Sequence, residues 1–172
     1  MEPTRPTVGP REVLERYRQA AISQSADDLW PLYAADAVHE FPFTPPGVPS
    51  RLTGRDEIVD WITTGWRTFP LRYERYRTIA THDTGDPRTI IVEQQAIGRN
   101  ISSGREFALP NIIVLTVHNG QITHLRDYVD VLAAANAIDP ASADRGQPSD
   151  AKDTAVSTLI PSGDGDDVAA ER

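Results

Sequence analysis

Apolar positions in the first third of the chain recur at the spacing of α-helices. From Pro10 to Ser23 an apolar stripe opposes a charged one, and Pro10 suits the first position of a helix. Ser25 predicts the N-cap of a second, short helix. The run Thr53-Gly54-Arg55-Asp56 resembles a capping box and predicts that a third helix begins there.

Alternation of apolar and polar residues replaces the helical spacing after residue 70. It predicts four strands, at residues 71–82, 89–97, 105–117 and 122–132. The pair Asn119-Gly120 favours a type I′ hairpin between the last two. A further short strand is predicted at residues 38–43. The proline-rich loop that follows it, residues 44–54, forms either a rigid rim over a cavity or an ordinary linker.

This order of elements predicts an α+β fold, in which a curved antiparallel sheet wraps around the N-terminal helices. A sheet bent in this way leaves a conical cavity, and alternate strand residues point into it. The other face of the sheet carries apolar residues such as Tyr128 and either Val114 or Val117. We therefore expect a second subunit to cover this face and the protein to be a homodimer.

Composition and charge divide the chain into three parts. Residues 140–172 hold seven acidic and three basic side chains but no aromatic one, which predicts a disordered acidic tail. Residues 1–9 are expected to be flexible, and residues 10–139 to form one domain. The net charge of −8 argues against nucleic acid as a partner. The chain has no cysteine, no apolar run of membrane-spanning length and no signal-peptide pattern, so a cytoplasmic location is expected.

Two aspartates of the last predicted strand are the first candidates for chemistry. Asp127 and Asp130 are three residues apart and therefore lie on opposite faces of a regular strand. Aspartate is disfavoured in strands, and a carboxylate in an apolar interior costs free energy unless it is hydrogen-bonded or functional. We interpret Asp127 as a catalytic acid or base inside the cavity, and Asp130 as a structural or inter-subunit contact.

The first predicted strand offers a second candidate but does not say which residue it is. His39 and Glu40 are neighbours, so only one of them faces the cavity. An inward Glu40 would share a proton with Asp127, whereas the other register turns His39 and Phe41 inward. No histidine spacing resembles a metal site, and no phosphate-binding or nucleophile motif is present, so we expect no metal and no cofactor.

Neutral polar and aromatic residues complete the predicted site. Amide side chains at inward strand positions can orient a carbonyl or hydroxyl group of a ligand, and aromatic side chains supply an apolar wall. The residues expected to bind substrate in these two ways are Gln94, Asn111, Tyr33, Phe41, Trp61 and Trp66.

Three local features resemble the SnoaL-like branch of the NTF2-like superfamily. They are the helix start Gly54-Arg55-Asp56, the Asn119-Gly120 hairpin and the final strand Arg126-Asp127-Tyr128-Val129-Asp130, and the resemblance covers residues 11–138. The branch includes polyketide cyclases, limonene-type epoxide hydrolases and PhzA/PhzB-type proteins, with ketosteroid isomerases as more distant relatives. The resemblance implies a role in proton transfer for Asp127. Gln94 and Ala96 stand where the epoxide hydrolases carry an arginine and a second aspartate, so their arginine-bridged pair is missing.

The resemblance implies a small-molecule enzyme of secondary metabolism, such as antibiotic biosynthesis, that works without a cofactor. Asp127 would catalyse cyclisation, isomerisation, dehydration or epoxide opening of a polyketide-like or polycyclic substrate in an apolar pocket. Gln94 or Asn111 would stabilise charge that develops on oxygen. The alternative is a non-catalytic ligand-binding or dimerisation module with the same fold.

Overall fold

The computed structural model describes residues 8–45 and 47–139. The disordered tail predicted for residues 140–172 lies outside the described residues. Of residues 1–9, the structure describes Val8, which packs against the core, and Gly9, which is the N-cap of the first helix.

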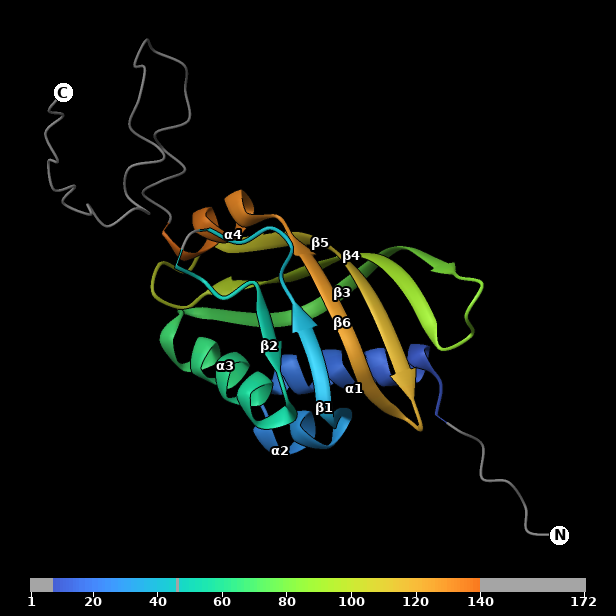
Figure 1. Ribbon diagram of the computed structural model, residues 1–172. Coiled ribbons are helices and arrows are strands. Elements are labelled where there is room, and N and C mark those ends of the chain that lie inside the picture. The colour runs from blue at the N-terminus through green and yellow to red at the C-terminus, as the bar shows by residue number, and fades with distance from the viewer. Residues whose placement is uncertain (1–7, 46, 140–172) are drawn as a thin grey trace, which may run out of the picture.

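The described residues form four α-helices and a six-stranded sheet (Figure 1). The helices are α1 (Pro10–Ser23), α2 (Ala26–Leu29), α3 (Arg55–Thr68) and α4 (Val131–Ile138), with a 3₁₀ turn, η1 (Trp30–Leu32), after α2. The strands are β1 (Tyr33–Glu40), β2 (Arg51–Thr53), β3 (Leu71–Asp83), β4 (Thr89–Asn100), β5 (Glu106–His118) and β6 (Gln121–Val129).

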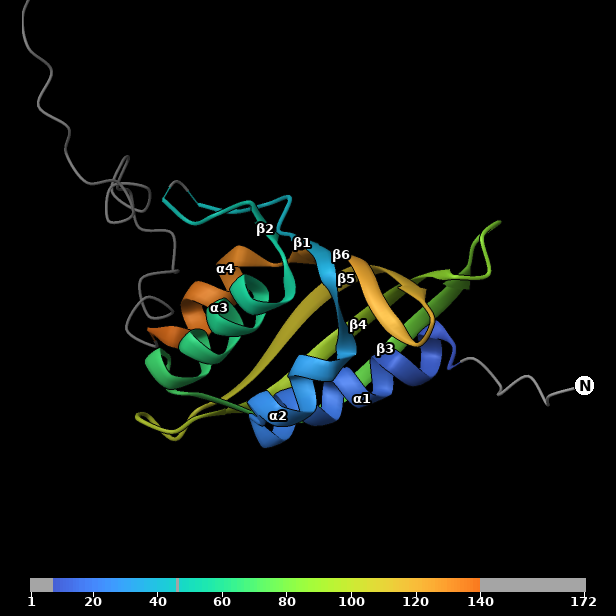
Figure 2. The ribbon, with the colours of Figure 1, turned by 60° about the horizontal axis from the view of Figure 1, so that its bottom comes forward.

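The sheet is curved, and its strand order is β2-β1-β6-β5-β4-β3. All neighbours are antiparallel except β1 and β6, which run parallel, so the expectation of a purely antiparallel sheet is wrong at this pair. Helices α1, α2 and α3 lie against one side of the sheet, as Figure 2 shows. The α+β cone predicted from the order of elements is confirmed.

Capping residues fix several helix and turn boundaries as predicted. Helix α1 begins at Pro10, and the Ser25 hydroxyl accepts the Asp28 backbone N–H at 3.1 Å at the start of α2. Asn119 and Gly120 both have positive φ, 51° and 77°, as a type I′ turn requires. At α3 the N-cap Gly54 has no side chain, and the Glu57 carboxylate instead accepts the Thr53 backbone N–H at 2.8 Å.

Three elements differ from the sequence prediction. Strand β1 begins at Tyr33 and ends at Glu40, instead of running from residue 38 to 43. The proline-rich loop contains the short strand β2, which pairs with β1. The last strand ends at Val129, because Asp130 starts α4 by accepting the backbone N–H groups of Leu132 and Ala133 at 3.1 and 2.9 Å. Asp130 therefore has the structural role that was expected.

The inner face of the sheet packs against the helices in one large core. Among its fully buried side chains are Leu29, Ile58, Ile113, Leu115 and Leu125. Val117 lies in this core, with 3% exposure, so Val114 is the one of the two valines that is on the outer face. Regular alternation along β5 puts Val117 on the same side as Ile113 and Leu115.

Candidate active site

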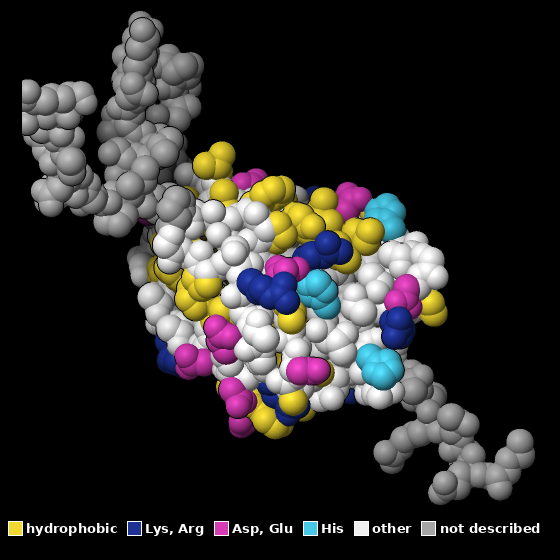
Figure 3. Space-filling model, in the orientation of Figure 1, with side chains coloured by type: hydrophobic (Ala, Val, Ile, Leu, Met, Phe, Trp, Pro, Cys, Tyr) yellow, Lys and Arg dark blue, Asp and Glu magenta, His cyan; other side chains and the backbone are white. Residues whose placement is uncertain are grey.

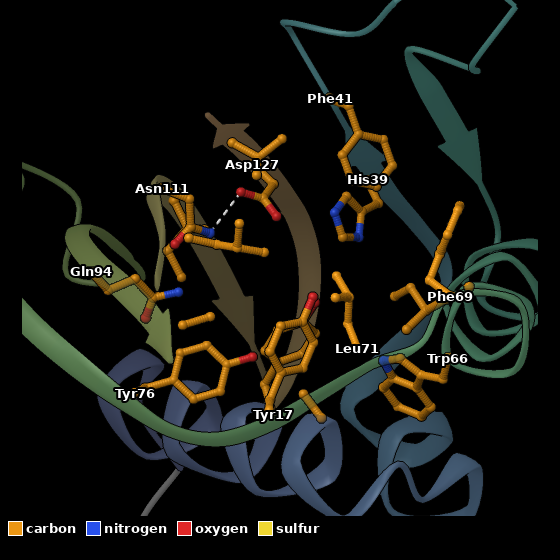
Figure 4. A pocket seen from close by; sticks show the side chains of 18 of the residues that line it. Tyr17, His39, Phe41, Trp66, Phe69, Leu71, Tyr76, Gln94, Asn111 and Asp127 are labelled. Carbon is orange, nitrogen blue, oxygen red and sulfur yellow. Dashed lines mark hydrogen bonds between the residues drawn. The ribbon is translucent and has the colours of Figure 1, made fainter. Parts of the chain in front are cut away.

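A cavity of about 210 Å³ lies between α1, α3 and the inner face of the sheet. Most of its wall is aromatic or aliphatic, and Figure 4 shows the side chains that converge on it. The aromatic residues are Tyr17, Phe41, Trp61, Trp66, Phe69, Tyr73 and Tyr76. Four other side chains bring nitrogen or oxygen atoms to the wall: His39, Gln94, Asn111 and Asp127.

Asp127 is the one carboxylate among the described residues that line this cavity. It lies on β6 opposite Ile113 of β5, with its side chain on the inner face. Burial raises the pKa of Asp127 to about 6, and the hydrogen bond from Asn111 only partly opposes that rise. The bond runs from Asn111 Nδ2 to Asp127 Oδ1 at 2.8 Å. A neutral partner therefore holds a carboxyl group that can gain or lose a proton near neutral pH.

His39 enters the cavity from β1 and is 1% exposed. Its ring stacks on Phe41 at 4.5 Å between centroids, and its Nδ1 lies 2.9 Å from the Tyr33 hydroxyl oxygen. Burial, with a smaller contribution from the charge of His124, lowers the pKa of His39 to about 3. The imidazole is therefore uncharged at neutral pH.

Gln94 is oriented from behind by a buried arginine of α1. Arg18 Nε and Nη2 donate to Gln94 Oε1 at 3.0 and 2.6 Å. The same guanidinium contacts Glu15 and Thr78. Because both donors hold the amide oxygen, the amide nitrogen is turned toward the cavity (Figure 4). The sequence pattern assigned Arg18 to the charged, solvent-facing side of α1, and nothing in that pattern distinguished it.

Two of the predicted site residues do not reach the cavity. Glu40 lies on the outer face, where its carboxylate is 2.6 Å from His124 Nε2 and 2.8 Å from Arg51 Nη1. Its hydrogen bond with His124 is the main reason that its pKa is lowered. The register that would pair Glu40 with Asp127 is therefore not the one the strand adopts. Tyr33 is fully buried behind His39 and does not line the cavity.

The other predicted residues are brought together: Asp127, His39, Phe41, Trp61, Trp66, Gln94 and Asn111 all line the cavity. No described residue of the loop 44–54 lines the cavity. Sequence reasoning missed Tyr17, Tyr73 and Tyr76. Tyr73 and Tyr76 are three residues apart and should lie on opposite faces of a regular strand. A register irregularity between Tyr73 and Arg75 lets both line the cavity.

Two further searches concern the described residues only. Nowhere in residues 8–45 and 47–139 do three or more histidine or acidic side chains gather closely enough to hold a metal ion. Within the same ranges, every helix is too short or too polar to cross a lipid bilayer.

The curved sheet and the cavity that it encloses define an NTF2-like protein with a ligand-sized pocket. A family model for the SnoaL-like domain matches residues 14–125, and the chain belongs to the SnoaL-like family. The resemblance seen in the sequence is thus confirmed.

Two curated relatives are themselves uncharacterised. YesE of Bacillus subtilis is 27% identical over 128 residues, which are 73% of this chain and 84% of YesE. A PhzA/B-like protein of Pseudomonas aeruginosa is 33% identical over 108 residues, 62% of this chain and 74% of the relative.

Solved structures extend the likeness. A Bacillus subtilis protein provisionally named an isomerase has a TM-score of 0.68 and 26% identity, over 74% of this chain and 91% of the other. An LEH-like epoxide hydrolase of M. tuberculosis has a TM-score of 0.54 and 17% identity. The match covers 73% of this chain and 86% of the hydrolase. A Pseudomonas putida protein provisionally named a polyketide cyclase has a TM-score of 0.59 and 15% identity. The match covers 76% of this chain and 98% of the other. At such low identity the last two share the fold alone.

Proposed function

We propose that this chain is a cofactor-independent enzyme that isomerises or cyclises a small carbonyl compound by acid–base catalysis. The observation that carries the proposal is Asp127, a half-buried carboxyl group that lines a mostly apolar cavity and accepts a hydrogen bond from one neutral amide. Its pKa of about 6 suits a group that takes a proton from a substrate and returns it at another atom. The relative named as an isomerase supports this class of reaction.

The lining of the cavity favours proton transfer over epoxide opening. Asp127 has Asn111 as its hydrogen-bond partner, and Arg18 bonds to Gln94, whereas the epoxide hydrolases of the resemblance bridge two carboxylates with an arginine. A neutral surrounding holds the Asp127 carboxyl close to its ionisation point, where it works as both acid and base.

The volume of the cavity limits the size of the substrate that can bind. Pockets for drug-sized ligands usually enclose about 300–1,000 Å³. The cavity of about 210 Å³ lies below this range. A compound of one or two rings therefore fits the proposal better than the extended polycyclic substrate that the sequence led us to expect.

The test is exchange of carbon-bound hydrogen with solvent, because an enzyme that forms an enolate from a ketone catalyses this exchange. Purified protein in D₂O would be incubated with cyclohexanone, 3-hydroxycyclohexanone, 1-indanone and 2-tetralone, and deuterium uptake followed by NMR. Asp127→Asn keeps the shape and the bond from Asn111 but cannot take up the proton, so the exchange rate should fall by about 10²–10⁴-fold.

Asp36→Asn is the matched control, because Asp36 is exposed on β1 and should leave the exchange rate unchanged. Equal rates for the wild type and Asp127→Asn would contradict the proposal. Ligand binding without exchange by either protein would support the non-catalytic binding module instead.

We also propose that the chain forms a homodimer through the outer face of the sheet. Ile112 is 43% exposed there, and Phe43, 62% exposed, contacts Tyr128 with ring centroids 5.6 Å apart. Figure 3 shows this face, with hydrophobic side chains above a cluster of charged and histidine side chains. Ile112→Lys should halve the mass measured by light scattering, whereas Ile101→Lys, in the exposed β4–β5 turn, should not. A wild-type monomer would refute the proposal.

A further inference from the structure

Two buried polar atoms of the cavity wall have no hydrogen-bond partner: His39 Nε2 and Asn111 Oδ1. Buried polar atoms are almost always paired in folded proteins, because losing water without gaining a partner costs free energy. Both atoms belong to residues that line the same cavity as Asp127, and Figure 4 shows His39 and Asn111 on either side of that carboxylate. A ligand that pairs both atoms would remove this cost.

The hydrogen of the His39 ring is placed by the tyrosine behind it. Burial raises the pKa of Tyr33, so its hydroxyl keeps its hydrogen at neutral pH. The single hydroxyl hydrogen of Tyr33 is then available for His39 Nδ1, 2.9 Å away. An uncharged imidazole that accepts at Nδ1 carries its hydrogen on Nε2. The unpaired nitrogen is therefore a donor.

The amide of Asn111 has the opposite polarity on its unpaired side. Its Nδ2 donates to Asp127 Oδ1 at 2.8 Å, and this bond fixes which end of the amide faces the carboxylate. The remaining atom, Oδ1, can only accept. The cavity thus presents one donor, one acceptor and a carboxyl group that can exchange a proton.

From this arrangement we infer that the ligand is a compact hydroxy-carbonyl compound, with its carbonyl oxygen on His39 Nε2–H and its hydroxyl hydrogen on Asn111 Oδ1. This inference rests on the proposed function for its chemistry and names the substrate class. Asp127 takes a proton from the carbon beside the carbonyl, and the C–H electron pair becomes the enolate C=C bond as the carbonyl electrons move to oxygen. His39 N–H stabilises the oxyanion, as an uncharged histidine can. Protonated Asp127 then returns the proton to carbon.

The first test needs no ligand. Nitrogen-15 NMR of the wild type at pH 7 should show His39 with its hydrogen on Nε2 and an accepting Nδ1. Tyr33→Phe removes the donor to Nδ1, and the His39 signals should move toward a mixture of the two tautomers. Tyr33 is a positioning residue, so this spectroscopic change is expected even where the fold is intact. A hydrogen on Nδ1 in the wild type would overturn the inference.

The second test uses three matched probes: cyclohexanone, cyclohexanol and 3-hydroxycyclohexanone, each titrated by NMR. Loss of one neutral hydrogen bond corresponds to about a three- to tenfold loss of affinity. His39→Phe should weaken the binding of the two ketones by this factor and leave the binding of cyclohexanol unchanged. Asn111→Leu should remove the advantage of 3-hydroxycyclohexanone over cyclohexanone. His118→Phe is the control, because His118 is exposed at the end of β5, away from the cavity.

The outcomes separate this inference from the proposed function. Binding that depends on His39 and Asn111 but occurs without hydrogen exchange would uphold the ligand class and refute catalysis by Asp127. Hydrogen exchange that is lost in Asp127→Asn but unchanged in His39→Phe would support catalysis by Asp127 and refute the inferred ligand class. No saturable binding of 3-hydroxycyclohexanone, or an equal effect of His39→Phe on all three probes, overturns the inference.

Discussion

The two faces of the sheet near the ends of β1 and β6 each carry one histidine and one carboxylate. On the inner face these are His39 and Asp127, and on the outer face His124 and Glu40. His39 and Glu40 are neighbours in the sequence, yet their environments are opposite. His39 is sealed in the cavity wall, whereas the Glu40 carboxylate is bonded to His124 and Arg51 at the surface.

The difference shows that the surroundings, and not the residue types, decide the chemistry. Desolvation without an opposite charge disfavours the charged form of each inner group, raising the pKa of Asp127 to about 6 and lowering that of His39 to about 3. On the outer face, a hydrogen bond from His124 and nearby positive charge lower the pKa of Glu40. The inner groups destabilise the fold when charged, and the outer pair contributes modestly to it.

The largest effect is expected from His39 under acid conditions. Its pKa is about 3 in the folded chain and about 6.5 in the unfolded one, so the unfolded state binds more protons between these values. The free energy of unfolding should therefore fall as the pH drops through this window, by up to about 1.4 kcal/mol per pH unit. His39→Phe should remove this contribution, as measured by urea unfolding from pH 3.5 to 7.

Between about pH 4 and 6 the titration of Asp127 makes the free energy of unfolding fall as the pH rises, opposite to the effect of His39. The measurement is therefore the difference between wild type and His39→Phe in the slope of this free energy against pH. His118→Phe, on an exposed turn, should leave the wild-type slope in place. If the two variants showed the same slope, His39 would not be held uncharged by burial.

A smaller effect is expected from Asp127 above neutral pH. Its pKa is raised to about 6 by folding, so the native state binds more protons between about pH 4 and 6, and stability falls as the pH rises through that window. The shift of about 2 pH units corresponds to about 3 kcal/mol. Asp127→Asn should therefore stabilise the protein by about that amount at pH 8 and by nothing below pH 4.

Urea unfolding at pH 8 and pH 3.5 measures this gain, with Asp36→Asn as the exposed control. A variant no more stable than the wild type at pH 8 would mean that the carboxylate is well solvated, and the contrast between the faces would be lost. A gain at pH 8 combined with lost hydrogen exchange would mark Asp127 as a residue kept for function at the expense of stability.

The smallest effect is expected from Glu40, whose side chain is 23% exposed. Surface ion pairs contribute up to about 1 kcal/mol, so Glu40→Gln should lower the free energy of unfolding by no more than that at pH 7. Because folding lowers the pKa of Glu40, the contribution is present above the unfolded pKa and is lost as the pH falls through the folded one.

Thermal or urea unfolding at low and high salt measures the Glu40 effect, which salt should weaken. A loss well above about 1 kcal/mol that resists salt would indicate that the outer face is covered. That outcome would sharpen the comparison, since it is what the proposed dimer interface predicts.

The sequence by itself determined the order of the elements other than β2 and α4, and the main carboxylate of the site. Pro10, Ser25 and Asn119-Gly120 act through local sterics and capping bonds, which neighbours in the chain suffice to form. The position of Asp127 followed from period-two alternation along β6, because no irregularity intervenes between Leu125 and Asp127. Asp127 was then a candidate for the site because placing an unpaired carboxylate in an apolar interior costs free energy.

Only the tertiary structure decided which residue of β1 faces the cavity and what surrounds Asp127. The register of β1 depends on its pairing with β2 and with β6, and β6 is distant in the chain. Likewise, a register irregularity in β3 brought Tyr73 and Tyr76 to one face, and Arg18 reached Gln94 across 76 positions of sequence. These contacts depend on how strands shift against each other and how α1 packs on the sheet. Local sequence patterns predict neither the shift between strands nor the packing of α1, because many registers bury the same apolar stripe.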